Sequence, residues 1–154
     1  MEEVKRAVIN YLKSVGPVVG MDPGESTGLA IVGFGQVVVS TLGFDATLGF
    51  IDTLTQQNIL VVEDYVEYQS NRGGNAFNHA IPAQLIGAIK MKSRQEGFTV
   101  HLQHANSGKS SCPDDLLKMI FDVKGFTRHE KDALRHVVTF ALRRVGNKIA
   151  RAVQ

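Results

Sequence analysis

Segments with a helical spacing of apolar residues alternate along this chain with short runs of β-branched residues. The spacing of Val4, Val8 and Leu12 predicts an amphipathic helix, and Asp45 is placed to cap a second one. Most of the β-branched runs are bounded by glycine or proline, which is typical of strands. We predict helices over residues 2–15, 45–57, 80–95, 114–121 and 129–148, and strands over residues 18–22, 27–32, 36–41, 59–63 and 98–103.

The order of these elements predicts an α/β fold. The first three strands follow one another closely and favour an antiparallel meander, whereas the last two strands alternate with helices. Such a chain forms a five-stranded mixed sheet flanked by helices, an order compatible with the ribonuclease H-like architecture. Residues 1–17 are predicted to be a helical extension, and residues 18–154 the domain itself. Within the domain, residues 64–75 and 106–113 are polar and contain glycine, so both are predicted to be loops.

The composition is that of a globular domain with a single thiol. Of the 154 residues, 44% are hydrophobic and 21% are charged, and Cys112 is the one cysteine. One cysteine excludes an intrachain disulfide and a cysteine-built zinc site. The apolar runs are too short to span a bilayer, and the amino-terminal residues lack the apolar core of a signal peptide. We therefore expect a cytoplasmic protein with no membrane partner.

The formal net charge is only +2, but it is distributed unevenly. Residues 1–100 hold seven Lys and Arg against ten Asp and Glu, whereas residues 101–154 hold ten against five. A basic carboxyl-terminal third suits a nucleic-acid partner, although many other soluble domains also have a basic end.

Acidic side chains end two of the predicted strands. Asp22 and Glu63 each follow an apolar run, and Glu63 ends the strand expected at the centre of the sheet. If the two strands are neighbours, their terminal carboxylates converge at one edge, where a bound cation offsets the cost of buried, unpaired charge. Carboxylate oxygens are the ligands that Mg²⁺ prefers, so this pattern favours a magnesium site.

The last predicted helix carries further candidate ligands. Asp132 follows His129 by three residues and His136 follows it by seven, so the three side chains lie along one helical face. Placed against the sheet, the first turn of this face reaches the two acids that end the strands. Two metal ions held by such a set are a standard arrangement for phosphodiester hydrolysis, because one activates water and the other stabilises the leaving oxygen.

Each of these acids also has an ordinary structural explanation. Asp22-Pro23-Gly24 is a good turn by itself, and Glu63 is equally explained as a solvated strand end. Glu130 and Asp132 fit the negative first turn that a helix dipole favours. The combination of the acids with the order of the elements, rather than any single acid, favours a metal site.

Three segments resemble the motifs of one nuclease family. Residues 18–28, Val-Val-Gly-Met-Asp-Pro-Gly-Glu-Ser-Thr-Gly, resemble the first motif of the RuvC-type Holliday junction resolvases. Residues 59–63 look like the family's second acidic strand, and residues 129–134 like its carboxyl-terminal motif, an acid or histidine followed three residues later by Asp-Ala. The resemblance covers roughly residues 18–146. It implies a homodimeric, magnesium-dependent endonuclease that nicks two opposing strands of a four-way DNA junction symmetrically.

The resemblance also implies the residues of the site. Asp22, Glu63 and Asp132 match the family's metal-binding carboxylates, and His129 stands where many members have an acid. Two Mg²⁺ ions per site are implied; His129 either ligates a metal, which would favour Mn²⁺ as a substitute, or contacts the scissile phosphate. Lys109 and Lys118 lie where the family has basic residues and are expected to contact DNA. Asn71 and Arg72 of the polar loop are further candidates, as are Tyr65 and Tyr68, which flank Val66 at the place where the family usually has an aromatic residue. The two tyrosines are equally explained as half-buried core residues, and the two lysines as residues of a solvated region.

Other functions fit parts of this pattern. The segment from Asp22 to Gly28 also resembles the first phosphate loop of actin-like ATPases, but those proteins have two lobes in a far longer chain, so no nucleotide cofactor is expected. A nuclease of the same fold that acts on other branched DNA or on structured RNA is the closest alternative. A protein that binds branched nucleic acid without cutting it is the third.

Overall fold

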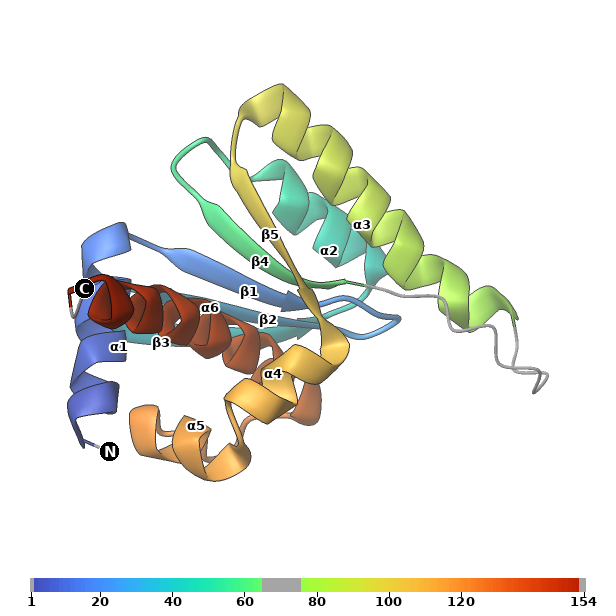
Figure 1. The fold of residues 1–154 in the computed structure, drawn as a ribbon. Coiled ribbons are helices and arrows are strands. Elements are labelled where there is room, and N and C mark those ends of the chain that lie inside the picture. Colours follow the sequence, from blue (N-terminus) through green and yellow to red (C-terminus); the bar gives the residue numbers. More distant parts are fainter. Residues whose placement is uncertain (1, 65–75, 153–154) are drawn as a thin grey trace.

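The computed structural model describes residues 2–64 and 76–152 as a sheet between two layers of helices (Figure 1). The strands are β1 (Val18–Asp22), β2 (Thr27–Gly33), β3 (Gln36–Leu42), β4 (Ile59–Asp64) and β5 (Thr99–His104). The helices are α1 (Glu2–Val15), α2 (Phe44–Asp52), α3 (Ala76–Glu96), α4 (Ala105–Ser111), α5 (Asp114–Ile120) and α6 (Arg128–Ala152).

The five strands form one mixed sheet in the order β3-β2-β1-β4-β5. β1 pairs antiparallel with β2, and β2 pairs antiparallel with β3, which confirms the predicted meander. β4 lies parallel between β1 and β5. The ribonuclease H-like arrangement expected from the element order is therefore the observed one. Because β1 and β4 are parallel neighbours, the acids at their carboxyl ends lie at the same edge of the sheet.

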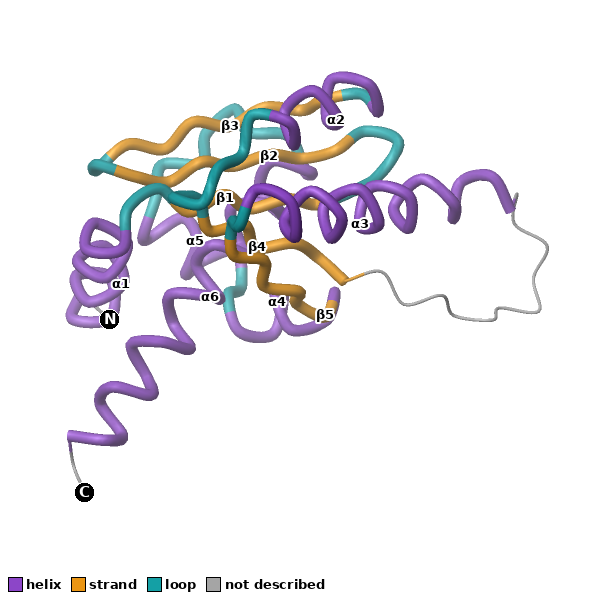
Figure 2. The backbone as a smooth tube through the Cα atoms, turned by 90° about the horizontal axis from the view of Figure 1, so that it is seen from above, coloured by secondary structure: helices purple, strands orange, loops and turns teal. Residues whose placement is uncertain are grey.

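The two faces of the sheet are covered by different helices. Val18 and Val61 point to the side of α1, α5 and α6, whereas Val19 and Leu60 point to the side of α2 and α3, and all four are buried. Figure 2 shows α3 along the β4–β5 half of the sheet and α2 near β3. The two sides thus have separate hydrophobic cores, and the strands between them are apolar on both faces, as is usual for a covered sheet.

α6 lies unusually close to the sheet because two facing positions are glycines. A Cβ added at Gly20 of β1 would lie 2.1 Å from the backbone oxygen of Ala133, and one at Gly28 of β2 would lie 2.0 Å from that of His129. Only a residue without a side chain fits at either place. Gly28 pairs with Asp22 in the β1–β2 register, so this contact brings the first turn of α6 to the end of β1.

α1 packs on the domain rather than standing apart from it. Val8 and Leu12 of α1 are buried in the same core as Leu134 and Val138 of α6. The division of the chain into an extension over residues 1–17 and a domain over residues 18–154 stays a prediction.

Some boundaries differ from those expected from the sequence. Residues 106–113 were expected to be a loop because they are rich in Ser, Gly and Asn, but residues 105–111 form α4. Tertiary packing explains the difference, since Gly108 lies against the side chains of Arg135 and His136 of α6. α2 ends at Asp52 rather than near residue 57, and α3 and α6 extend beyond their predicted ends. Asp45 lies in the first turn of α2, whose N-cap is Gly43, so the capping prediction was wrong.

Gly28→Ala tests the close approach of α6. We expect this variant to lose about 1–3 kcal/mol of unfolding free energy, because the new methyl group forces the helix away from the sheet. Gly49→Ala is the control: this glycine is in α2 with open space at its Cβ position, and alanine there favours the helix by up to about 1 kcal/mol. Urea unfolding of both variants measures the difference, and equal stabilities would contradict the packing described here.

Candidate functional site

Three neighbouring strands present a polar side chain to α6 at the same edge of the sheet. Asp22, Glu63 and Gln103 end or nearly end β1, β4 and β5. Glu63 of β4 pairs with Gln103 of β5. One residue earlier in each strand, Met21 of β1 pairs with Val62 of β4, so Asp22 and Glu63 follow a paired position. Since side chains alternate between the faces of a sheet, all three point to the side opposite Met21, which is the side that α6 covers.

Asp22 accepts a hydrogen bond from, or donates one to, the imidazole of His129, with 3.0 Å between Oδ2 and Nδ1. Burial raises the pKa of the Asp22 carboxyl, the hydrogen bond to His129 opposes that rise, and the negative charges of Glu63 and Asp132 add to it. Glu63 and Asp132 therefore lie near enough to Asp22 for their charges to raise its pKa.

Glu63 is held from behind by a buried histidine. His136 Nε2 lies 3.0 Å from Glu63 Oε2, and His136 Nδ1 lies 3.0 Å from Gln103 Oε1. Gln103 Nε2 also donates to the backbone oxygen of His136 at 3.2 Å. The prediction that His136 shares a helical face with His129 agrees with these contacts, since each histidine meets one of the strand acids.

Asp132 pairs with a buried arginine of its own helix. The guanidinium of Arg135, whose side chain is 7% exposed, contacts Asp132 Oδ1 and Asp114 Oδ1. Its Nε donates to the backbone oxygen of Cys112 at 2.9 Å. Arg135 thereby ties the first turns of α6 to α5, and it neutralises one of the three acidic charges next to the site.

The donor types fit a hard divalent cation, but the described side chains do not form a complete site as they lie. Within the described ranges, no three His, Cys, Asp or Glu side chains are grouped so that they could hold one ion. Three carboxylates are nevertheless the ligand chemistry of Mg²⁺ and Mn²⁺. The raised pKa of Asp22 reflects burial and negative charge that a cation would offset.

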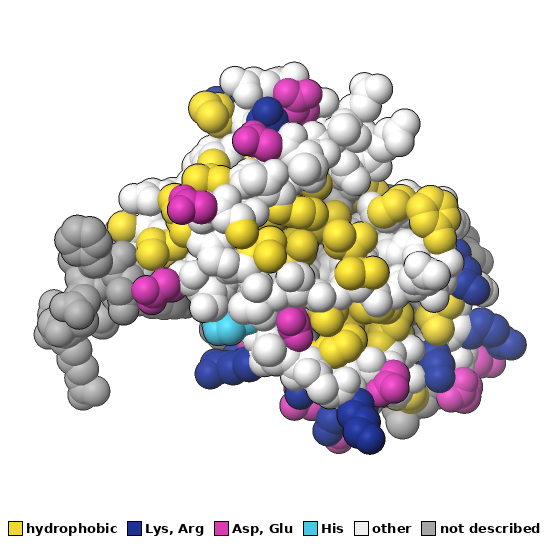
Figure 3. All heavy atoms as spheres, turned by 180° about the vertical axis from the view of Figure 1, so that it is seen from behind, with side chains coloured by type: hydrophobic (Ala, Val, Ile, Leu, Met, Phe, Trp, Pro, Cys, Tyr) yellow, Lys and Arg dark blue, Asp and Glu magenta, His cyan; other side chains and the backbone are white. Residues whose placement is uncertain are grey.

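A basic surface adjoins these acids. A cleft of about 300 Å³ is lined by Lys109, Arg128, Lys131 and Arg135 together with Asp114 and Asp132. A second hollow of about 340 Å³ shares Lys131 and adds Lys118 and Lys124. On the face drawn in Figure 3, Lys and Arg side chains gather along the lower margin. We call Lys109, Lys118, Lys124, Arg128 and Lys131 the basic surface.

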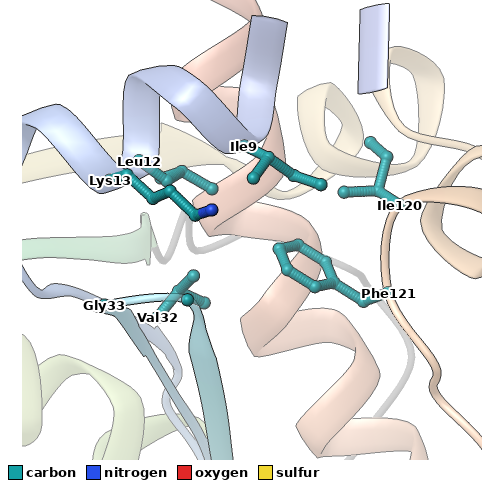
Figure 4. Close-up of a pocket in the computed structure, with 8 residues that line it drawn as sticks. Ile9, Leu12, Lys13, Val32, Gly33, Ile120 and Phe121 are labelled. Carbon is teal, nitrogen blue, oxygen red and sulfur yellow. The ribbon is translucent and has the colours of Figure 1, made fainter. Parts of the chain in front are cut away.

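A separate apolar pocket lies away from the acids. It has a volume of about 290 Å³ and opens between α1, β2 and α5 (Figure 4). The described residues that line it include Ile9, Leu12, Val32 and Phe121, with Lys13 as the charged member and no acid. This pocket therefore carries none of the chemistry discussed for the sheet edge.

The structure brings most, but not all, of the predicted site residues into view. Asp22, Glu63, His129 and Asp132 lie at one edge of the sheet, and Lys109 and Lys118 lie on the basic surface. The remaining predicted DNA contacts lie outside the described residues: Tyr65, Tyr68, Asn71 and Arg72.

The sequence interpretation missed two residues of the site. Gln103 could have been found from the alternation of side chains along its strand, because it occupies the position in β5 that pairs with Glu63 of β4. Arg135 was detectable by its spacing of three from Asp132 on the same helix. Their partners, however, depend on the pairing of β4 with β5 and on the packing of α5 against α6, which periodicity does not give.

Solved structures with a similar fold were found, although no protein-family model and no curated protein sequence matches this chain significantly. A Thermus thermophilus RuvC in complex with a Holliday junction substrate superposes with a TM-score of 0.62 and 18% identity, over 85% of this chain and 96% of that chain. The chain has the RuvC fold. A second Thermus thermophilus RuvC structure matches with a TM-score of 0.56 and 18% identity, over 84% of this chain and 96% of its own. RuvC is thus matched over nearly its whole length, and the fold implied by the motifs is confirmed.

The described part of the chain has no helix that could span a membrane, because none of its helices is both long enough and apolar enough.

Asp22→Asn tests the electrostatic cost of the site. A carboxyl whose pKa is raised by folding contributes stability below its unfolded pKa of about 3.9, and this contribution is lost as the pH rises through the folded value. At a pH above the pKa of Asp22 in the folded protein, the ionised carboxylate opposes folding. Asp22→Asn is therefore expected to raise the unfolding free energy when a metal chelator is present. Urea unfolding across a pH series measures it.

Asp45→Asn is the matched control, because Asp45 is exposed and its charge favours the first turn of α2. This control should lose a little stability. An Asp22→Asn protein that is less stable than wild type at every pH would contradict the described electrostatics.

Proposed function

We propose that this protein is a structure-selective DNA endonuclease that resolves four-way junctions by paired, symmetric, metal-dependent phosphodiester hydrolysis. The observation that carries the proposal is the gathering of Asp22, Glu63 and Asp132 at one sheet edge of the RuvC fold, beside a basic surface. One of the RuvC structures that share this fold is in complex with a Holliday junction substrate. Branched DNA is therefore the substrate class that we assign.

The site residues have separate roles in the proposed reaction. Asp22, Glu63 and Asp132 would hold two Mg²⁺ ions, or Mn²⁺ in their place, and the bound ions supply an activated water and charge stabilisation at the scissile phosphate. His129, whose Nδ1 lies 3.0 Å from Asp22 Oδ2, would either ligate metal itself or contact that phosphate. The basic surface positions the DNA backbone, because Lys and Arg neutralise phosphates without reading sequence.

A second copy of the chain would complete the reaction. Symmetric nicks in two opposing strands need two equivalent active sites, and a two-fold dimer supplies them in fixed relation. We therefore assign a homodimer as the cutting species.

A second candidate function is a protein that binds branched DNA without cutting it. The observation that favours it is the pairing of Asp132 with Arg135, together with the lack of a preassembled three-ligand group within the described ranges. Cleavage assays separate the two functions directly.

Substitution of each acid tests the metal mechanism. Purified protein is offered a four-way junction, a fork, single-stranded DNA and structured RNA with Mg²⁺ or Mn²⁺. We expect paired nicks in the junction, and we expect Asp22→Asn, Glu63→Gln and Asp132→Asn each to lower the rate at least about 100-fold while junction binding is kept. Asp45→Asn, an exposed acid of α2, should cut like wild type. Binding without any cleavage by the wild type supports the second candidate, and cleavage by the acid variants removes the metal mechanism.

Charge removal on the basic surface tests the DNA interface. Lys109→Ala and Lys131→Ala should weaken junction binding and lower the slope of log affinity against log salt by about 0.9 for each lost phosphate contact on duplex arms. Lys92→Ala is the control, since Lys92 pairs with Asp52 and Glu96 on the opposite side of the sheet. Fluorescence anisotropy over a salt series gives both slopes. Equal slopes for all variants would show that these lysines do not contact DNA.

A further inference from the structure

His136 is buried at the centre of a hydrogen-bonded chain that ends at Glu63. Its side chain is 2% exposed, and both ring nitrogens are engaged, Nδ1 with Gln103 and Nε2 with Glu63. Gln103 is 3% exposed, whereas the side chain of Glu63 is 31% exposed. The chain thus begins in the core and reaches solvent at the carboxylate.

Gln103 fixes the orientation of the imidazole by two contacts. The backbone oxygen of His136 can only accept a hydrogen bond, so the amide nitrogen of Gln103 must face it. This places Gln103 Oε1 against Nδ1, and Nδ1 must therefore carry the hydrogen of that bond. The ring is also confined on its edge, because Gly108 of α4 lies 3.5 Å, measured from an added Cβ, from His136 Cε1.

These hydrogen-bonded side chains would cost folding free energy if their role were only structural. Burying an amide and an imidazole costs free energy that their mutual hydrogen bonds only offset, and apolar residues of similar volume would fill the same space at lower cost. The distinct physical effect of the hydrogen-bonded chain is to limit where Glu63 Oε2 lies. Partners behind a metal ligand act in this way, by orienting the ligand atom, and their loss typically lowers metal affinity about 10–100-fold.

We propose that Gln103 and His136 are positioning residues that hold the Glu63 carboxylate toward Asp22 and thereby set the affinity of the site for a divalent metal ion. This inference rests on the proposed function. Neither residue is a ligand, since both are buried and the nitrogens of His136 are already bonded. Gln103 acts on Glu63 indirectly, through its hydrogen bonds to His136.

Gln103→Leu tests the proposal, because leucine has a similar size and removes both hydrogen bonds. Manganese binding to the purified protein is measured without DNA, by the electron paramagnetic resonance signal of the free ion. We expect the dissociation constant for Mn²⁺ to rise about 10–100-fold. The Mn²⁺ concentration that half-saturates junction cleavage should rise by the same factor, while the rate at saturating Mn²⁺ falls less than tenfold.

Val138→Ala is the matched control, since Val138 is fully buried on the same helix and touches the hydrophobic core instead of the acids. It should lower the melting temperature and leave Mn²⁺ binding unchanged. Gln103→Met replaces the leucine variant if that protein does not fold, with the same expected shift.

The outcomes separate this inference from the proposed function. Wild-type protein that binds Mn²⁺ and cuts junctions, with unchanged Mn²⁺ binding in the folded Gln103 variant, overturns the positioning role alone. Wild-type protein that binds Mn²⁺ without cutting removes the proposed nuclease function, and a weakened Gln103 variant then still supports the positioning role. Wild-type protein without Mn²⁺ affinity overturns both.

Discussion

The backbone of α6 rests directly on β1 and β2 at Gly20 and Gly28, and this contact sets the position of every candidate site residue on the helix. Ala133 and His129 supply the carbonyl groups that face the two glycines. A larger residue at either glycine would lift the first two turns away from the sheet. The hydrogen bond between His129 and Asp22 depends on that closeness, because the two residues are far apart in sequence.

The same helix also supplies a partner for each acid. His129 meets Asp22, His136 meets Glu63, and Arg135 pairs with Asp132. For Asp22 this partner is not sufficient: the hydrogen bond to His129 only partly opposes the rise in pKa that burial and the charges of Glu63 and Asp132 cause. The arrangement is typical of a functional site, at which stability is given up for a local concentration of charge.

Much of the fold and part of the site were predictable from the sequence. The apolar runs before Asp22 and Glu63 predicted two strands that end in acids, and the observed pairing of β1 with β4 brings these ends together. The spacing of His129 and Asp132 predicted a shared helical face. α4 was missed because its Ser- and Gly-rich sequence has low helix propensity and forms a helix only by packing on α6.

Contacts between elements distant in sequence explain the rest. The bond between Gln103 and His136 needs the parallel pairing of β4 with β5, and the pair of Arg135 with Asp114 needs α5 to lie beside α6. Local patterns constrain which face a residue occupies, but they do not say which element will cover that face. The sequence therefore predicted the acids of the site, but not the hydrogen bonds and ion pairs that connect them to their partners.

The most direct measurement is the location of a bound metal ion. Crystals of the protein grown or soaked with Mn²⁺ give anomalous difference density that marks the ion without assumptions about ligands. The account predicts a peak within ligand distance of oxygens from Asp22, Glu63 and Asp132, about 2.0–2.3 Å away, with the Asp132 carboxylate released from Arg135 at least in part. Manganese bound only elsewhere, with Asp132 still turned to Arg135, would contradict it.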